Sequence, residues 1–213
     1  MLAMNYQFIS IEGCIGAGKT SLATMLSEEL DARLILEEFD DNPFLPKFYK
    51  EPDKYAFQLE LSFLAERYQQ LREKLSSHDL FQPFTVSDYI INKSLIFSRK
   101  NLDKDEYLLY QKLFNIVESS IPKPDLLVYL YLDVEHLQTN IKKRGRNYEQ
   151  DIKKEYLDKI QDSYFDYIKH IQDFPVLMIN TNKIDFVKNE GDYEKLKKVI
   201  FDKHENGLQI IEL

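Results

Sequence analysis

Residues 13–20 of this 213-residue chain read GCIGAGKT, and they decide the fold. The stretch fits the pattern G-x-x-x-x-G-K-[ST], with an apolar, strand-like run before it and helical periodicity after it. Glycines let backbone N–H groups turn inward around phosphates, and the N-terminus of the following helix adds its positive dipole end. The sequence therefore predicts a phosphate-binding loop made of Gly13, Cys14, Ile15, Gly16, Ala17, Gly18, Lys19 and Thr20.

Two side chains of this loop are expected to act on a nucleotide directly. Lys19 should reach the β- and γ-phosphates, and the Thr20 hydroxyl should ligate Mg²⁺. The loop alone does not decide whether the phosphoryl group passes to water, to a nucleoside or into a switch protein. The remaining sequence must decide this.

Strand and helix patterns alternate along the rest of the chain. Strands are predicted at residues 6–12, 33–38, 84–88, 126–133 and 176–180, and helices at 19–30, 54–75, 105–119, 134–143, 152–172 and 192–204, with one more through Leu95 and Phe97. Such alternation is typical of a parallel α/β sheet. We therefore expect a three-layer α/β fold of the P-loop NTPase type, with a mostly parallel five-stranded sheet flanked by helices, in one domain over residues 1–213.

Composition excludes several other classes. Hydrophobic residues make up 44% and charged residues 30%, as in ordinary globular proteins. The net charge of -8 argues against binding a nucleic acid polymer, because affinity for duplexes comes mainly from phosphate neutralisation. The single cysteine, Cys14, cannot form an internal disulfide. With no apolar stretch of about 20 residues and no secretory leader pattern, we expect a cytoplasmic protein without a membrane partner.

A second motif tests whether the chain is a GTPase. Residues 182–185, NKID, match the N-K-x-D signature that reads guanine, but a GTPase also needs D-x-x-G after a strand. The three glycines downstream of the phosphate loop are preceded, three positions earlier, by lysine, lysine and histidine. The γ-phosphate sensor is missing, so residues 182–185 are interpreted as a polar turn near the nucleotide base.

Ordered motifs between the loop and this turn resemble those of the deoxynucleoside kinase family, relatives of the thymidylate kinases, over nearly the whole chain. LEEFDDNPFL at residues 36–45 is close to the pattern E-P-V…D-N-P-x-L of the bacterial members. The resemblance assigns Glu37 to the 5′-hydroxyl of the substrate and to base catalysis. Glu38 stands where the family has proline, which leaves the choice between the two glutamates open.

FYKEPDKYAFQLELSFLAERY, residues 48–68, resembles the substrate-binding segment of the family. By this resemblance Tyr49 would bond the sugar 3′-hydroxyl, and Tyr55 and Phe57 would pack near the base, although core packing is the alternative for such aromatics. The family reads the base with a glutamine, and counting from Tyr49 places Glu60 at that position. Arg67, seven residues later, lies on the same helical face.

VSDYIINKSLIF, residues 86–97, occupies the place of the family motif E-R-S or D-R-S. Asp88 matches the acid and is a candidate for Mg²⁺ contact or for the catalytic base. The arginine expected next is Tyr89, which is the largest departure from the pattern. Lys93, about one helical turn further on, could supply the missing charge.

KKRGRNYEQD, residues 142–151, resembles the Arg-rich lid of the family, R-x-R-x-x-E. Arg144 and Arg146 would clamp the γ-phosphate and neutralise charge in the transition state. Glu149 matches the lid acid that bonds the 3′-hydroxyl. Asp185 and Phe186 fall where the family places its adenine-contacting loop.

The identity of residue 60 suggests the substrate. An ionised carboxylate only accepts hydrogen bonds, so Glu60 favours a base edge that carries donors. Guanine offers N1–H and N2–H₂ side by side, and Arg67 could donate to its O6. The acceptor is therefore expected to be deoxyguanosine, or purine deoxynucleosides generally, although a protonated Glu60 would behave like glutamine.

Together these patterns indicate an ATP- and Mg²⁺-dependent kinase that phosphorylates the 5′-hydroxyl of a deoxynucleoside. Two alternatives stay open: a nucleoside monophosphate kinase of the thymidylate type, and a nucleotide-binding regulator with little turnover, which the tyrosine at position 89 would permit. The resemblance also implies a homodimer that forms through helices beside the sheet.

Overall fold

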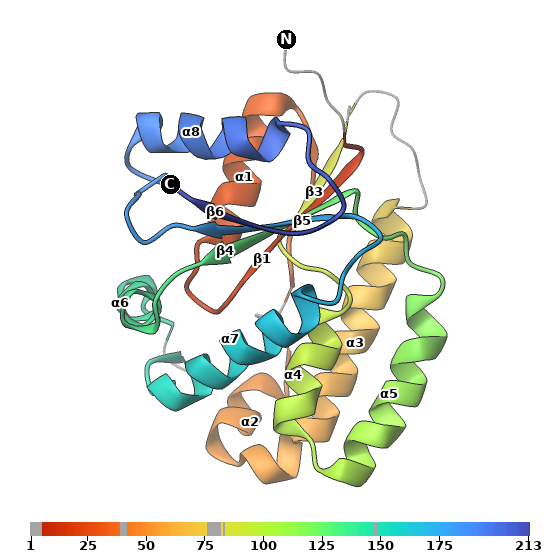
Figure 1. Cartoon of the computed structure of the whole chain (residues 1–213). Coiled ribbons are helices and arrows are strands. Elements are labelled where there is room, and N and C mark those ends of the chain that lie inside the picture. The colour runs from red at the N-terminus through yellow and green to blue at the C-terminus, as the bar shows by residue number, and fades with distance from the viewer. Residues whose placement is uncertain (1–5, 39–41, 76–81, 83, 147–148) are drawn as a thin grey trace. The chain divides into compact units, whose positions relative to one another are not determined.

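The computed structural model describes residues 6–38, 42–75, 82, 84–146 and 149–213. These residues form two compact units (Figure 1). The first, called here the sheet unit, comprises the described residues within 1–36, 79–89 and 123–213; the second, the helical unit, comprises those within 37–78 and 90–122. Among the described residues, no helix has the combination of length and apolarity that crossing a bilayer requires.

The sheet unit is built on six parallel strands in the order β2-β3-β1-β4-β5-β6. The strands are β1 (Phe8–Gly13), β2 (Arg33–Ile35), β3 (Thr85–Ser87), β4 (Leu126–Tyr131), β5 (Pro175–Asn180) and β6 (Gly207–Glu212). The central strand β4 begins with five residues, LLVYL, whose side chains are fully buried. A strand covered on both faces is expected to be continuously apolar, and the predicted parallel α/β fold is confirmed.

The sixth strand is a correction to the expected five. The sequence pattern predicts residues 176–180 as the last strand, but β6 pairs in parallel with β5, Pro175 opposite Gly207. At this edge the strand is only partly covered, and Ile210 is 64% exposed. A partly exposed edge strand lacks the strong apolar run by which the central strands are predicted.

Four helices flank this sheet: α1 (Lys19–Leu30), α6 (Val134–Arg144), α7 (Lys154–Ile168) and α8 (Glu190–Phe201). Helices α1 and α8 lie on one side of the sheet and α7 on the other (Figure 1). Helices α1 and α8 are joined by a hydrogen bond of 2.6 Å, which the Tyr193 hydroxyl on α8 donates to Glu29 on α1. Helix α7 is tied to the strands through Gln161, whose amide donates to the Leu132 carbonyl at 2.7 Å.

The helical unit consists of α2 (Leu45–Lys50), α3 (Pro52–Leu75), α4 (Lys93–Asn101) and α5 (Lys104–Glu118). Helix α5 begins with a capping box, in which Asp103 accepts from the Glu106 backbone at 2.8 Å and Glu106 accepts from the Asp103 backbone at 3.3 Å. The core contains Leu59, Leu64, Leu71, Tyr110 and Phe114, all at most 3% exposed. The six-residue helix α2 was not predicted.

Candidate active site

The phosphate loop connects β1 to α1 through positions where only glycine fits without strain. Gly16 has φ +90°, and a Cβ atom there would lie 2.8 Å from the Leu137 carbonyl oxygen. Gly18 has φ +89°, and a Cβ atom there would lie 2.9 Å from the ring of Phe186. Both values of φ are ones that L side chains rarely adopt. The glycine spacing of the motif is therefore required by the backbone as well as by a phosphate.

Contacts within the loop keep it closed on itself. The Lys19 ammonium donates to the Cys14 carbonyl at 3.1 Å, and the Ala17 backbone N–H donates to the same oxygen at 3.1 Å. Asn140 on α6, which the sequence analysis did not single out, donates to the Gly16 carbonyl at 2.9 Å. The half-buried Lys19 is thus held at the loop by a bond that a phosphate group can replace.

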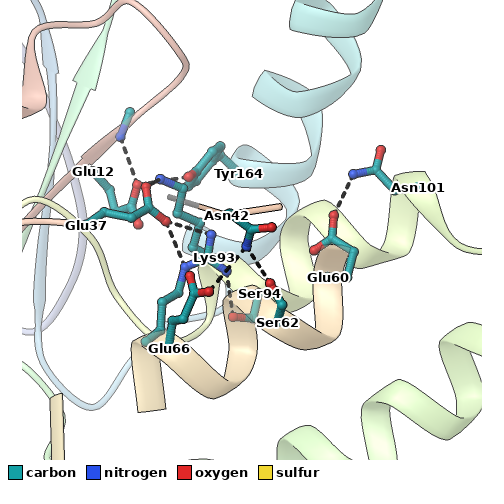
Figure 2. A network of polar contacts seen from close by, with 12 residues as sticks. Glu12, Glu37, Asn42, Glu60, Ser62, Glu66, Lys93, Ser94, Asn101 and Tyr164 are labelled. Atoms are coloured by element: carbon teal, nitrogen blue, oxygen red, sulfur yellow. Dashed lines mark hydrogen bonds and ion pairs between the residues drawn. The ribbon is translucent and has the colours of Figure 1, made fainter. Parts of the chain in front are cut away.

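Beneath the loop lies a buried carboxylate that the sequence reasoning missed. Glu12, the residue before Gly13, is fully buried. Its Oε2 accepts a hydrogen bond of 2.8 Å from the Tyr164 hydroxyl and one of 3.3 Å from the Gly13 backbone N–H (Figure 2). This pair fastens the start of the loop to α7.

Thr20 and Asp88 are brought together, as a shared Mg²⁺ site requires. The Thr20 hydroxyl donates to Asp88 Oδ2 at 2.5 Å, and the Asp88 backbone N–H donates to the Ile35 carbonyl at 3.1 Å. Over the described ranges no group of three or more His, Cys, Asp or Glu side chains could hold a metal ion. Mg²⁺ is usually bound by one or two carboxylates together with waters and substrate phosphates, so a hydroxyl and one carboxylate beside a phosphate loop fit this ion.

The lid residues are joined in one cluster. Glu149 is buried, and its two carboxylate oxygens are paired with Arg144 and, at 3.6 Å, with Arg146. The Arg144 side chain is 36% exposed and that of Arg146 is 28% exposed. Glu149 thus orients two guanidinium groups that keep surface in contact with water. Residues 147 and 148 of this segment lie outside the described part of the chain.

Side chains of the polar turn at residues 182–185 are hydrogen-bonded to neighbouring parts of the protein. Asn182 Oδ1 accepts 3.0 Å hydrogen bonds from the Asp133 backbone N–H and from His136 Nδ1. Asp185 is exposed, and its carboxylate accepts from the Lys188 ammonium at 2.7 Å. Phe186 is buried against Gly18, at the phosphate loop. The asparagine and the aspartate that a guanine-reading motif would present to a base are engaged with neighbouring residues.

In the helical unit, Glu37 is the centre of a buried ion cluster (Figure 2). Its Oε1 accepts from Arg67 Nε at 2.8 Å and pairs with Arg67 Nη2 at 2.6 Å, while its Oε2 is ion-paired with the Lys93 ammonium. Arg67 Nη1 donates to the Ser94 hydroxyl at 2.8 Å. Burial alone would raise the pKa of Glu37, but Lys93 and Arg67 outweigh it and lower this pKa to about 2. Glu37 is therefore an ionised hydrogen-bond acceptor at neutral pH.

Position 89, where the family motif has an arginine, holds a tyrosine, and the ammonium of Lys93 lies beside Glu37. Tyr89 belongs to the sheet unit and is fully buried. Lys93, which opens α4 and is 7% exposed, is paired with Glu37 together with Arg67. Glu38 is exposed and accepts from Gln70 at 2.9 Å, so of the two glutamates only Glu37 joins the cluster among the described contacts.

Glu60 on α3 is a buried carboxyl group with one open oxygen. The residue is 2% exposed, whereas the neighbouring Gln58 is exposed. Asn101 Nδ2, at the end of α4, donates to Glu60 Oε1 at 2.6 Å (Figure 2). Oε2 is buried without a hydrogen-bond partner among the described residues. Burial raises the pKa of Glu60 to about 7, against the opposing effect of the Asn101 hydrogen bond.

Partly exposed aromatic side chains lie on α3, the helix of Glu60, and on α2. Tyr55 and Phe57 on α3 are half-buried, and Tyr49 on α2 is half-buried with its ring 5.6 Å from that of Phe48. Phe63, which the sequence analysis left unassigned, lies under the Arg67 guanidinium at 5.0 Å. Partly exposed rings suit the packing of a nucleobase, because a ring confined to the core would be fully covered.

Comparisons with known proteins point in one direction. A family model described as deoxynucleoside kinase matches residues 9–204. The chain is 40% identical over 195 residues to a deoxyguanosine kinase of Bacillus subtilis (strain 168), which covers 89% of this chain and 93% of that protein. It is 32% identical over 211 residues to a deoxyadenosine kinase of Lactobacillus acidophilus, covering 92% of this chain and 96% of that protein.

Solved structures share the fold. A deoxyadenosine kinase from M. mycoides with bound dATP superposes with a TM-score of 0.78 at 24% identity, over 92% of this chain and all (100%) of that one. The structure of the same enzyme with the products dCMP and a flexible dCDP gives a TM-score of 0.76 at 26% identity, over 90% of this chain and 98% of that one.

Proposed function

The chain belongs to the deoxynucleoside kinase family, and from this premise we propose that its preferred acceptor is deoxyguanosine, with ATP and Mg²⁺ on the donor side. As a member of this family it is a phosphotransferase that uses a nucleotide phosphate donor. The more specific assignments below rest on the geometry of individual residues.

One observation carries the choice of base: Oε2 of Glu60 is buried and has no hydrogen-bond partner within the described part of the chain. A buried acceptor left without a donor costs about 1–3 kcal/mol, and more when it is charged, so a ligand that supplies an N–H gains that energy. Guanine presents N1–H and N2–H₂ on one edge, whereas adenine presents only its N6 donor to an ionised carboxylate. The relative from Bacillus subtilis that is 40% identical is a deoxyguanosine kinase, in line with this choice.

On the donor side, the phosphate loop would hold the nucleotide by its backbone N–H groups. Lys19 would release the Cys14 carbonyl and turn to the β- and γ-phosphates. Thr20 and Asp88 would hold Mg²⁺, which when bound neutralises charge on the phosphates. Asp185 and Phe186 would lie near the donor base.

On the acceptor side, Glu37 would accept the hydrogen bond of the 5′-hydroxyl and receive its proton. A carboxylate with a pKa of about 2 is a weak base. In a loose transition state the attacking oxygen keeps its proton until late, so that positioning matters more than basicity. Lys93 and Arg67 would keep Glu37 ionised and stabilise negative charge that develops on the 5′-oxygen.

The lid would complete the site. Arg144 and Arg146 would neutralise the transferring phosphoryl group, and Glu149 would bond the 3′-hydroxyl together with Tyr49. Glu149 holds both arginines in this structure, and its bond to a sugar hydroxyl would couple the lid to the presence of the acceptor. Tyr55 and Phe57 would pack against the base.

We further propose a cytoplasmic homodimer, with the two units acting as one domain. Helix α5 exposes Leu109 and Ile116, which are 51% and 71% exposed and lie seven residues apart on one helical stripe. Exposed apolar residues on one stripe are typical of a surface that another chain covers. A second copy of the chain is the expected partner.

The experiment that tests this function is phosphorylation of dG, dA, dC, dT and dTMP with ATP and Mg²⁺. The expected result is transfer to deoxyguanosine in preference to the others. Transfer only to dTMP would instead indicate a monophosphate kinase, and transfer only to pyrimidine nucleosides would contradict the role of Glu60. Omission of Mg²⁺ is the control for the donor side.

A further inference from the structure

Asn101 is the last residue of α4, and its side chain reaches the base-reading glutamate of α3. Its amide nitrogen donates to Glu60 Oε1 at 2.6 Å. On the far side of Glu60, the Tyr110 hydroxyl of α5 donates to the Glu60 backbone carbonyl at 3.2 Å and so holds the main chain. Glu60 is therefore held at its main chain and at Oε1, while Oε2 is buried without a hydrogen-bond partner among the described residues.

From this contact we propose that Asn101 determines purine specificity: it occupies Oε1 and leaves Oε2 as the atom that meets the base, so that guanine binds to the ionised and adenine to the protonated form of Glu60. The proposal rests on the function proposed above and names its specificity device. Asn101 acts through Glu60 and is thus a positioning residue.

Hydrogen-bond chemistry connects the two forms to two bases. An ionised Oε2 accepts the N1–H of guanine, while adenine N1 carries no hydrogen and would meet it acceptor to acceptor. A protonated Oε2 donates to adenine N1, but it would meet the N1–H of guanine donor to donor. Protonation of Glu60 Oε2 therefore changes the preferred purine from guanine to adenine.

The surroundings of Glu60 place this exchange near neutral pH. The groups that face it are Asn101 and Lys93 on α4, Arg67 on the same helix α3, Glu37 before α2 and Tyr110 on α5. Burial is the largest influence and raises the pKa of Glu60 to about 7, while Asn101, Arg67 and Lys93 act in the opposite direction. The pKa of Glu37 is about 2, so that group does not titrate between pH 6 and 8.

The wild-type enzyme therefore has a measurable signature. The ratio kcat/KM reports the ionisation of the free enzyme. With a pKa of about 7, the ionised fraction of Glu60 rises about tenfold from pH 6 to pH 8. The kcat/KM for deoxyguanosine should rise by that factor, and the kcat/KM for deoxyadenosine should fall by a similar one.

Asn101→Leu tests the part that Asn101 plays. Leucine has a similar size but donates no hydrogen bond, so the pKa of Glu60 should rise by about one unit. At pH 7 the ratio of kcat/KM for deoxyguanosine over deoxyadenosine should fall about tenfold, and the variant should regain the wild-type pH 7 ratio at about pH 8. Asn101→Asp places a like charge beside Glu60 and should also raise its pKa, so that the pH profile of the purine ratio moves to higher pH. This variant provides the same test if the leucine variant folds poorly.

Asn92→Ala is the matched control. It removes another asparagine-to-glutamate hydrogen bond of the helical unit, 2.6 Å from Asn92 to Glu118, and should leave the purine ratio unchanged. An equal loss for both purines at every pH in the Asn101 variants would overturn the proposal while the kinase assignment stands. A wild type that phosphorylates no purine deoxynucleoside would instead remove the proposed function on which the proposal rests.

Discussion

Lys93 and Glu37 form an ion pair inside the helical unit, where each side chain is about one-tenth exposed or less: 9% for the lysine and 11% for the glutamate. Arg67 pairs with the other oxygen of the same carboxylate, so two cations surround one anion. The family motif would place an arginine directly after Asp88, but in this chain a tyrosine stands there and the cation comes from the start of α4. Lys93 therefore places a positive charge beside Glu37, the proposed acceptor carboxylate, although the motif arginine is missing.

Lys93→Met should lower kcat about 100-fold, because it removes one preorganised cation from the proposed 5′-oxygen site. Glu37 would lose the largest influence that lowers its pKa, so this pKa should rise from about 2. The free energy of unfolding should fall by about 3 kcal/mol, as expected when one partner of a buried ion pair is removed. Steady-state kinetics and urea denaturation measure both effects.

The control for this variant is Lys100→Met, which removes an exposed lysine from the same helix. It should change neither kcat nor stability appreciably. A Lys93→Met enzyme with wild-type kcat would show that Lys93 plays no part in catalysis.

Glu60→Gln should change how stability depends on pH. The pKa of Glu60 is raised from 4.5 to about 7, so the folded protein keeps a proton that the unfolded chain loses between these pH values. This contribution to stability is fully present below pH 4.5 and is lost as the pH rises through 7. The variant should therefore gain about 3 kcal/mol relative to wild type between pH 4.5 and pH 8.

Urea denaturation at pH 5 and pH 8 measures this gain. Glu73→Gln, at an exposed glutamate of the same helix, should leave the difference between the two pH values as in wild type. Equal pH dependence of wild type and Glu60→Gln would mean that Glu60 is ionised throughout this range.

Asp88→Asn should raise the Mg²⁺ concentration for half-maximal activity by at least about tenfold. The Thr20 hydroxyl and the Asp88 carboxylate are 2.5 Å apart, and the substitution removes the charge of this pair. Thr20→Ser keeps a hydroxyl group and should need the same Mg²⁺ concentration for half-maximal activity as the wild type. An unchanged Mg²⁺ requirement in Asp88→Asn would place the metal elsewhere.

Arg144→Gln should lower kcat about 100- to 1,000-fold with little change in KM for the nucleoside, because the lid arginine is proposed to act on the transition state. Lys142→Gln removes an exposed neighbouring charge and is the control. A change confined to KM would assign Arg144 to ground-state binding.

Ile116→Glu should convert the proposed homodimer into a monomer, because a charge would be buried in the interface. Sedimentation velocity at several protein concentrations measures the mass. Val187→Glu alters another exposed apolar residue, 55% exposed, in the sheet unit and should leave the dimer intact. A wild-type protein that sediments as a monomer would refute the dimer.

Local sequence signals were sufficient to predict the phosphate loop and the central elements of the sheet unit. The phosphate loop is a contiguous motif, the helix predicted at 19–30 coincides with α1, and β4 is a continuous apolar run. The edge strand β6 was missed because only one of its six residues is buried and two are exposed, and α2 because six residues are too few for helical periodicity.

The partners in the acceptor half could not be predicted in the same way. Glu37, Glu60 and Arg67 stood out because their positions match family motifs, but what each one touches depends on how α3 and α4 pack. Asn101 lies 41 residues from Glu60, and no local pattern links the two. Likewise, periodicity does not reveal that Lys93 is buried beside Glu37 rather than exposed.

The most direct test of the account compares kcat/KM for deoxyguanosine and deoxyadenosine at pH 8 in the wild type and in Glu60→Gln. At this pH Glu60 is mostly ionised, so the wild type should prefer deoxyguanosine. The loss of a charge-assisted hydrogen bond should reduce this preference about tenfold in the variant. A wild type that prefers deoxyadenosine or a pyrimidine, or a variant with an unchanged purine ratio, would contradict the account.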